Sequence, residues 1–212
     1  MQKNQFIYNT IIIFVAIVAI SGCNSAQTEK TTYTFDTTNM ISFKGGLHIS
    51  KDVKKKTVAQ VEIPDFYLDK SHVTVAEFHA LVIAKNYTTQ AENFGNSGVF
   101  LYENNEWQMI DSAYYLYPFG KENQKAADNH PVTQVSWNDA KWYCECIGKR
   151  LPSRYEWEYA ARYGNKDKNT LYAWGNDTTQ GNEFLANFWQ GDFPDTNTIA
   201  DGFLYTAPVG IF

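Results

Sequence analysis

Oxygen-bearing side chains gather in an irregular, glycine-rich stretch near the end of the sequence. They are Asn187, Asp192, Asp195, Asn197 and Asp201. Carboxylate and amide oxygens, together with loop carbonyls, are the ligands that Ca²⁺ takes in proteins. The spacing of an EF-hand loop is absent, and these residue types also shape turns. The spacing alone therefore favours turn-forming side chains, with a calcium site as the alternative.

Cysteine chemistry is limited to three residues. Cys144 and Cys146 lie two apart in a segment that we predict to be helical, where they point to different faces, so a disulfide between them is not expected. They are either reduced core residues or partners of cysteines absent from this sequence. The third, Cys23, follows an apolar N-terminal run.

The histidines are His48, His72, His79 and His130. Their spacing fits no metal-ligand pattern, and we interpret them as surface or capping residues. Glycine-rich phosphate loops, nucleophile elbows and HExxH zinc motifs are also absent from the sequence.

Charged residues cluster between positions 149 and 162. They are Lys149, Arg150, Arg154, Glu156, Glu158 and Arg162. Arg150 and Arg154 could hold the carboxylate of a ligand in bidentate fashion. Because helix-capping residues and a tryptophan share the stretch, we favour a network of ion pairs that ties one helix to another.

Three capping boxes predict helices that would position these residues. Thr74 with Glu77 begins a helix over 75–85, and Ser136 with Asp139 begins one that Gly148 stops, with Trp137, Ala140, Tyr143, Cys144 and Ile147 as its buried stripe. Ser153 with Glu156 begins a third, which ends at Gly164 and turns Trp157, Ala160 and Ala161 inward. Strands are predicted over 40–43, 58–63 and 66–69. Residues 86–129 are predicted to be loop-rich, and residues 165–212 to form turns and short strands. Short helices among aromatic loops indicate an α+β domain.

The N-terminus is typical of an exported lipoprotein. Lys3 precedes the apolar run Ile11 to Ile20, which is too short to span a bilayer comfortably. Ile20-Ser21-Gly22-Cys23 is similar to a bacterial lipobox, with Cys23 as the lipidated residue. We therefore predict a signal peptide over 1–22, a flexible tether over 23–39 and a folded domain over 40–212. A lipidated Cys23 predicts a protein that is anchored by lipid to a membrane of the bacterial cell envelope. We favour the outer membrane, on its periplasmic or surface side.

Composition excludes other classes of protein. Hydrophobic residues make up 44% and charged residues 19% of the 212 residues, as in a globular chain. The formal net charge is -5, and the longest basic run is Lys54-Lys55-Lys56, so nucleic-acid binding is not expected.

Ordered sequence blocks from about residue 40 to 212 resemble the formylglycine-generating, or sulfatase-modifying, enzyme family. The blocks include Thr89-Gln90-Ala91-Glu92, Gly148-Lys149-Arg150-Leu151-Pro152-Ser153, Glu156-Trp157-Glu158-Tyr159-Ala160-Ala161-Arg162, Asn187-Phe188-Trp189-Gln190-Gly191 and Thr206-Ala207-Pro208-Val209. The resemblance implies an α+β, C-type-lectin-like fold with few short helices and strands and much irregular structure.

The resemblance also implies chemistry. Enzymes of this family oxidise a cysteine of a sulfatase polypeptide to Cα-formylglycine with O₂ and a copper ion, Cu⁺, held by two thiolates. In that family the two copper-binding cysteines lie downstream of the Ala-Pro-Val block. Residues 40–212 are therefore expected to form an N-terminal portion of the domain, without catalytic residues and without oxidase activity of their own. The resemblance further implies a structural Ca²⁺ bound by the side chains of Asn187 and Asp201 and the carbonyls of Phe188 and Phe203.

Two functions remain open at this level. One is a formylglycine-generating oxidase that acts on sulfatases. The alternative is a non-catalytic envelope lipoprotein that uses the same fold as a binding or structural module for envelope proteins, as in gliding and secretion machinery. The histidine-rich iron motif of the related sulfoxide synthases has no match in this sequence, which disfavours that reaction.

Overall fold

A computed structural model describes residues 37–52, 56–163 and 170–212. The predicted signal peptide, Cys23 and most of the predicted tether lie outside these residues. Within them, the helices are α1 (Val75–Lys85), α2 (Gln90–Phe94), α3 (Trp137–Cys146) and α4 (Arg154–Arg162). None of these helices has the length and apolar character needed to cross a membrane.

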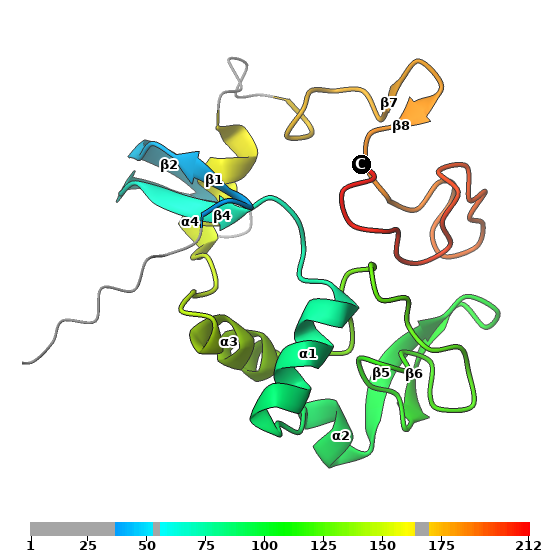
Figure 1. Ribbon diagram of the computed structural model, residues 1–212. Helices are drawn as coiled ribbons and strands as arrows, with labels where there is room; N and C mark the ends of the chain where they lie inside the picture. The colour runs from blue at the N-terminus through cyan, green and yellow to red at the C-terminus, as the bar shows by residue number, and fades with distance from the viewer. Residues whose placement is uncertain (1–36, 53–55, 164–169) are drawn as a thin grey trace, which may run out of the picture. The chain divides into compact units, whose positions relative to one another are not determined.

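The strands form two-stranded antiparallel sheets (Figure 1). They are β1 (Met40–Phe43) with β4 (Phe66–Asp69), β2 (Gly46–Asp52) with β3 (Thr57–Ile63), β5 (Asn96–Leu101) with β6 (Glu106–Asp111), and β7 (Thr179–Gln180) with β8 (Glu183–Phe184). Few short helices, small sheets and long irregular connections confirm the predicted α+β class.

One apolar cluster joins the first strands to α4. Phe43, Ile63 and Phe66 are buried and pack against Tyr155 and Tyr159. The rings of Phe43 and Phe66 stack with centroids 4.9 Å apart. The turn between β1 and β2 passes so close to β3 that a side chain at Gly45 would sit 2.0 Å from the Ile63 carbonyl oxygen. This close approach requires glycine.

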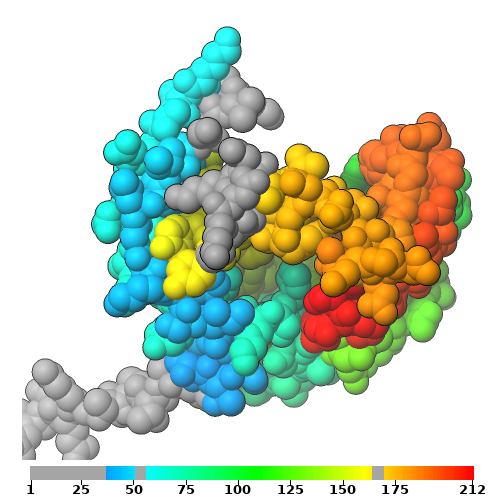
Figure 2. All heavy atoms as spheres, turned by 90° about the horizontal axis from the view of Figure 1, so that it is seen from above, coloured from blue at the N-terminus to red at the C-terminus, as the bar shows by residue number. Residues whose placement is uncertain are grey.

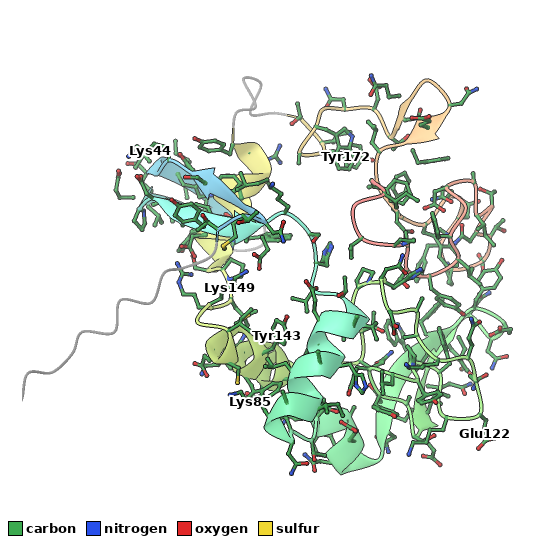
Figure 3. The ribbon with its side chains drawn as sticks, viewed as in Figure 1. Lys44, Lys85, Glu122, Tyr143, Lys149 and Tyr172 are labelled. Carbon is green, nitrogen blue, oxygen red and sulfur yellow. The ribbon has the colours of Figure 1, made fainter. Side chains whose placement is uncertain are left out.

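A second cluster joins α1 to α3. Phe78, Val82, Tyr115 and Tyr143 are buried together. The ring of Tyr143 points from α3 toward α1 (Figure 3) and stacks on Phe78 at 5.5 Å. Since aromatic rings bury large areas, these contacts account for much of the packing between the two helices.

All four helices begin with a capping box, including the three predicted ones. The fourth, Thr89 with Glu92, begins α2, a helix that the sequence analysis did not predict. The predicted helix at 75–85 has the predicted bounds. Gly148 follows α3 with a positive φ of 72°, as a stop signal should.

The prediction of a loop-rich segment without clear elements over 86–129 was wrong. Residues 86–129 contain α2 and the β5–β6 hairpin, whose strands bury only Val99 and so lack a strong alternating pattern.

The predicted buried faces of α3 and α4 were also partly wrong. Trp137 and Trp157 are 66% and 58% exposed, and Ile147 is also exposed. The buried residues of α3 and α4 include the capping carboxylates Asp139 and Glu156 instead.

Asp139 is fully buried and connects three elements. Its carboxylate accepts hydrogen bonds from the Ser136 N–H (2.8 Å), the Gln90 N–H (3.1 Å) and the Tyr87 hydroxyl (2.8 Å). Burial, together with this hydrogen bond, raises the pKa of Tyr87 to about 12. One side chain therefore completes the start of α3 and fixes the start of α2.

We predict that Asp139→Ala lowers the free energy of unfolding by about 3 kcal/mol, because it leaves the buried donors of Ser136, Gln90 and Tyr87 without an acceptor. Urea unfolding followed by circular dichroism measures this. Glu145→Ala on the exposed side of α3 is the matched control and should cost less than about 0.5 kcal/mol. Equal effects of the two substitutions would contradict the role given to Asp139.

Candidate cation site and adjoining cleft

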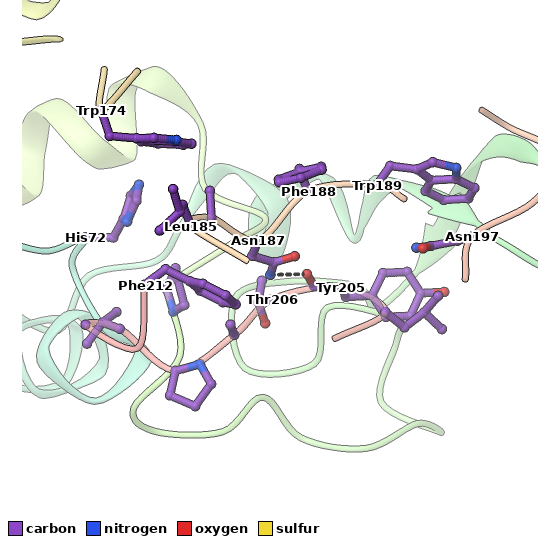
Figure 4. Close-up of a pocket in the computed structure, with 17 residues that line it drawn as sticks. His72, Trp174, Leu185, Asn187, Phe188, Trp189, Asn197, Tyr205, Thr206 and Phe212 are labelled. Atoms are coloured by element: carbon purple, nitrogen blue, oxygen red, sulfur yellow. Dashed lines mark hydrogen bonds between the residues drawn. The ribbon is translucent and has the colours of Figure 1, made fainter. Parts of the chain in front are cut away.

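Two stretches of the irregular C-terminal segment meet at the carboxylate of Asp201. One oxygen accepts the Phe188 N–H at 3.3 Å, and the other accepts the Phe203 N–H at 2.9 Å. The amide nitrogen of Asn187 donates to the Tyr205 carbonyl at 2.8 Å (Figure 4). The structure thus brings together Asn187, Phe188, Asp201 and Phe203, which lie up to sixteen positions apart in the sequence.

Buried amides hold this arrangement. The side-chain oxygen of Asn197 accepts the Ile199 N–H at 3.0 Å. The side chain of Gln190 accepts the Asp201 N–H at 3.4 Å and donates to the Phe188 carbonyl. Gln190 and Asn197 are both buried, so their hydrogen bonds satisfy backbone groups where no sheet is present.

These oxygens suit a hard cation. Asp201 supplies a half-buried carboxylate that accepts two backbone N–H groups. The Asn187 side chain uses its amide nitrogen for the Tyr205 carbonyl, which leaves its oxygen available, and the Phe188 carbonyl accepts the Gln190 side chain. Among the described residues no three His, Cys, Asp or Glu side chains converge, so a cation here would depend on amide and backbone oxygens. Ca²⁺ accepts such mixed ligands, whereas Zn²⁺ prefers nitrogen and sulfur.

The other acidic and amide residues of this segment have different places. Asp192 and Asp195 are exposed. Asn197 serves the backbone of its own loop, which agrees with a turn-forming role. The buried amide of Gln190 was not predicted, and its position between Trp189 and Gly191 in a turn-rich stretch is only a weak signal for such a residue.

An open cleft of about 650 Å³ adjoins Asn187 and Phe188 (Figure 4). Its walls are largely apolar and include Trp174, Phe212 and Pro208, with His72 at the edge near Trp174. Trp174 is held by stacking on Tyr172 at 5.2 Å and by its indole N–H, which donates to the Asp177 carbonyl at 2.9 Å. A cleft of this size and lining suits an apolar or aromatic group.

The charged residues between 149 and 162 pair within the protein, as predicted, but among the described residues these pairs do not tie one helix to another. Arg150 binds Glu156 in bidentate fashion at 2.7 and 2.5 Å. Lys149 reaches Asp69 at 2.5 Å, and Arg154 reaches Glu158 at 2.7 Å. The network joins α4 to the loop before it and β4 to the loop after α3.

Three histidines were wrongly predicted to be surface or capping residues. His48 is hydrogen-bonded to Glu158 at 3.1 Å, His79 to the Tyr115 hydroxyl at 2.9 Å, and His130 to the Thr206 hydroxyl at 2.8 Å. Each of these histidines is half-buried and bridges two segments far apart in the sequence. Single histidines give no sequence signal for such partners. His72 is exposed at the edge of the cleft.

Cys144 is half-buried and Cys146 exposed, and both are free thiols. Burial, with the nearby charge of Asp69, raises the pKa of the Cys144 thiol. Two positions on a helix are separated by about 200° of rotation, so the thiols point away from each other. Cys23, the predicted lipidation site, lies outside the described residues.

Glu156 makes the stability of the fold depend on pH. Hydrogen bonds from the Arg150 guanidinium, opposed by burial and reinforced by Ser153, hold the pKa of Glu156 at about 2, below its ordinary 4.5. A lowered folded-state pKa stabilises the protein above the unfolded value, and this contribution is lost as pH falls from about 4.5 toward 2.

We predict that Glu156→Gln lowers the free energy of unfolding by about 2 kcal/mol at neutral pH, a value reduced for the solvent exposure of Arg150. The difference from the unchanged protein should shrink as pH falls through this window. Denaturant titrations at several pH values test it, with exposed Glu122→Gln as the control. A difference that stays constant down to pH 2 would rule out this linkage.

Comparison with known proteins gives a consistent result. Residues 25–212 match the family described as the sulfatase-modifying factor enzyme 1-like domain. The formylglycine-generating enzyme of Bos taurus is 41% identical over 169 residues, which are 72% of this chain and 45% of that protein. The formylglycine-generating enzyme of Streptomyces coelicolor is 41% identical over 167 residues, which are 72% of this chain and 52% of that protein. The inactive C-alpha-formylglycine-generating enzyme 2 of Bos taurus is 35% identical over 198 residues, or 83% of this chain and 64% of that protein. The chain thus spans about half the length of the formylglycine-generating enzymes it matches.

Proposed function

Since the chain belongs to the sulfatase-modifying factor enzyme 1-like family, we propose that it is part of a formylglycine-generating enzyme, which would oxidise a cysteine of a sulfatase polypeptide to Cα-formylglycine. The identity of 41% across 72% of the chain carries this proposal. The stretches that meet at Asp201, which include the Asn187-Phe188-Trp189-Gln190-Gly191 block, support it. The substrate would be an extended polypeptide segment rather than a small metabolite.

Copper does not fit the cysteines that the structure describes. Cys144 and Cys146 point away from each other on α3, and the raised pKa of Cys144 opposes the thiolate form that binds Cu⁺. The two thiols cannot supply a shared pair of ligands without unwinding the helix. For these residues by themselves we therefore propose no oxidase activity.

A second function is favoured by a specific observation. An inactive C-alpha-formylglycine-generating enzyme 2 of Bos taurus is also among the relatives, 35% identical over 83% of this chain, so membership of the family does not by itself require oxidase activity. A non-catalytic binding or structural module in the bacterial envelope is therefore the alternative. The apolar run ending in Ile20-Ser21-Gly22-Cys23 supports export and a lipid anchor at Cys23 for either function.

The two functions predict different results in one experiment. Protein from the complete gene is loaded with Cu⁺ in air and incubated with a cysteine-containing sulfatase peptide, and an aldehyde-reactive hydrazide reports formylglycine. The enzyme proposal expects labelled peptide, whereas residues 1–212 alone should give none, with a serine-containing peptide as the blank.

No labelling by the complete protein, together with recovery of envelope proteins in cross-linked membrane fractions, would support the alternative. The lipid anchor is read in the same fractions. Cys23→Ser should move the protein out of the membrane fraction, and its retention there would exclude lipidation as the anchor.

We propose Ca²⁺ as the ion of this site, held by the side chains of Asn187 and Asp201 and the carbonyls of Phe188 and Phe203. Bound there, the ion would supply positive charge and coordination where few backbone hydrogen bonds exist. Asp201 would hold the two stretches of chain against it, and Gln190 would keep the Phe188 carbonyl oriented. The role is structural, because the site lacks an acid–base pair.

We predict that excess Ca²⁺ raises the midpoint temperature of thermal unfolding relative to protein in chelator. When free Ca²⁺ is a hundredfold above its Kd, the free energy of unfolding should increase by about 2.7 kcal/mol. Asp201→Asn should abolish the shift while it keeps a hydrogen-bond acceptor. Asp195→Asn, an exposed position of the same segment, should retain it. A shift that survives Asp201→Asn would place the ion elsewhere.

A further inference from the structure

Charge is divided unevenly along the described chain. Residues 86–120 and 170–212 contain no lysine or arginine. They contain the acidic residues Glu92, Glu103, Glu106, Asp111, Asp177, Glu183, Asp192, Asp195 and Asp201. Two long segments therefore carry acidic side chains with no basic residue of their own to neutralise them.

The fold brings these two segments together (Figures 1 and 2). The ring of Phe100 in β5 lies 5.5 Å from Phe193 and 6.3 Å from Trp189. At the hairpin turn, the Asn105 amide, oriented toward both carbonyls, donates to Tyr102 at 2.9 Å and to Pro194 at 2.8 Å. The tip of the β5–β6 hairpin and the loop around Phe193 therefore form one continuous surface.

Acidic and aromatic side chains are both exposed on this surface. Trp107 and Phe193 are 73% and 65% exposed, although each packs an edge or face against Phe100. Glu103 lies in the hairpin turn, and Asp192 and Asp195 flank the Phe193-Pro194 step; all three are exposed. Glu106 lies on the other side of the hairpin from Trp107, because successive side chains of a strand point to opposite faces. We call the set of Glu103, Trp107, Asp192, Phe193 and Asp195 the acidic aromatic face.

We propose that the acidic aromatic face binds a polypeptide segment rich in arginine or lysine. An aromatic ring attracts a cation over its face, most strongly when the ring is tryptophan and the cation is a guanidinium. Carboxylates beside the ring add charge-assisted hydrogen bonds and attract the cation from a distance. An apolar partner would gain from the rings alone and would leave the carboxylates of Glu103, Asp192 and Asp195 facing it.

The loop that carries Phe193 is held by its own hydrogen bonds. The Trp189 indole N–H donates to the Thr196 carbonyl at 2.9 Å, the Thr196 N–H donates to the Asp192 carbonyl at 2.8 Å, and the Trp189 ring packs on Phe193. The loop that carries Asp192 and Asp195 is therefore ordered before a partner arrives, which lowers the entropic cost of binding. Within the described residues, Glu103, Asp192 and Asp195 form no ion pair.

The test measures fluorescence anisotropy of a short labelled peptide of repeated Gly-Ser-Arg units with the full chain at low salt. The triple variant Glu103→Gln, Asp192→Asn, Asp195→Asn should weaken binding by about tenfold or more. The matched triple variant Glu62→Gln, Glu122→Gln, Glu145→Gln changes net charge equally at exposed positions elsewhere, and should change binding by less than about twofold. Trp107→Ala, at an exposed position that tolerates truncation, should weaken binding by several-fold.

A local readout keeps the result independent of folding. The indole N–H resonance of Trp107, assigned with Trp107→Phe, should shift on addition of the arginine peptide and stay in place with a Gly-Ser-Glu peptide. The proposal is overturned if the unchanged protein does not bind the arginine peptide, or if the two triple variants lose affinity equally. Binding that needs Trp107 but resists both salt and loss of the carboxylates would identify a neutral partner and would also overturn it.

Discussion

The buried carboxylate of Asp139 shows what this fold depends on. It accepts hydrogen bonds from Ser136, Gln90 and Tyr87, and thereby joins the starts of two helices and the link before them. The sheets of the described chain are two-stranded, so regular structure satisfies few backbone groups. Buried donors must then find side-chain acceptors, because each unpaired donor costs about 1 to 3 kcal/mol. Replacing such a side chain therefore affects several segments at once.

The C-terminal segment uses the same principle with a different result. Asn197 and Gln190 are buried and serve their own loop, as Asp139 serves the helices. Asp201 is only half-buried, and its oxygens bind backbone N–H groups on the border of an open cleft. A carboxylate in that position retains lone pairs for a cation, whereas the acceptors of Asp139 are enclosed by donors. Burial thus separates a structural carboxylate from a candidate ligand.

The sequence predicted what is local. Three capping boxes and the bounds of α1 follow from residues three or four positions apart, and the structure confirms them. The buried faces of α3 and α4 were not predictable from apolarity, because Trp137 and Trp157 are exposed while the carboxylates of Asp139 and Glu156 are buried. The β5–β6 hairpin is half-exposed and gave no alternation. Contacts such as Lys149 with Asp69 depend on tertiary approach, and the residues at Asp201 were found through family resemblance rather than through spacing.

Basic and acidic residues are distributed differently over the molecule, and packing alone does not require this. The basic residues in 149–162 are engaged by carboxylates or carbonyls inside the scaffold, as Arg150 is by Glu156. In residues 86–120 and 170–212, the acidic residues have no lysine or arginine beside them in the sequence. A concentration of like charge destabilises a compact state. A scaffold role gives no reason to keep Asp192 and Asp195 exposed beside Phe193. Cations, whether a calcium ion near Asp201 or a basic polypeptide at the hairpin tip, would relieve that repulsion, which makes this side of the molecule the one suited to binding.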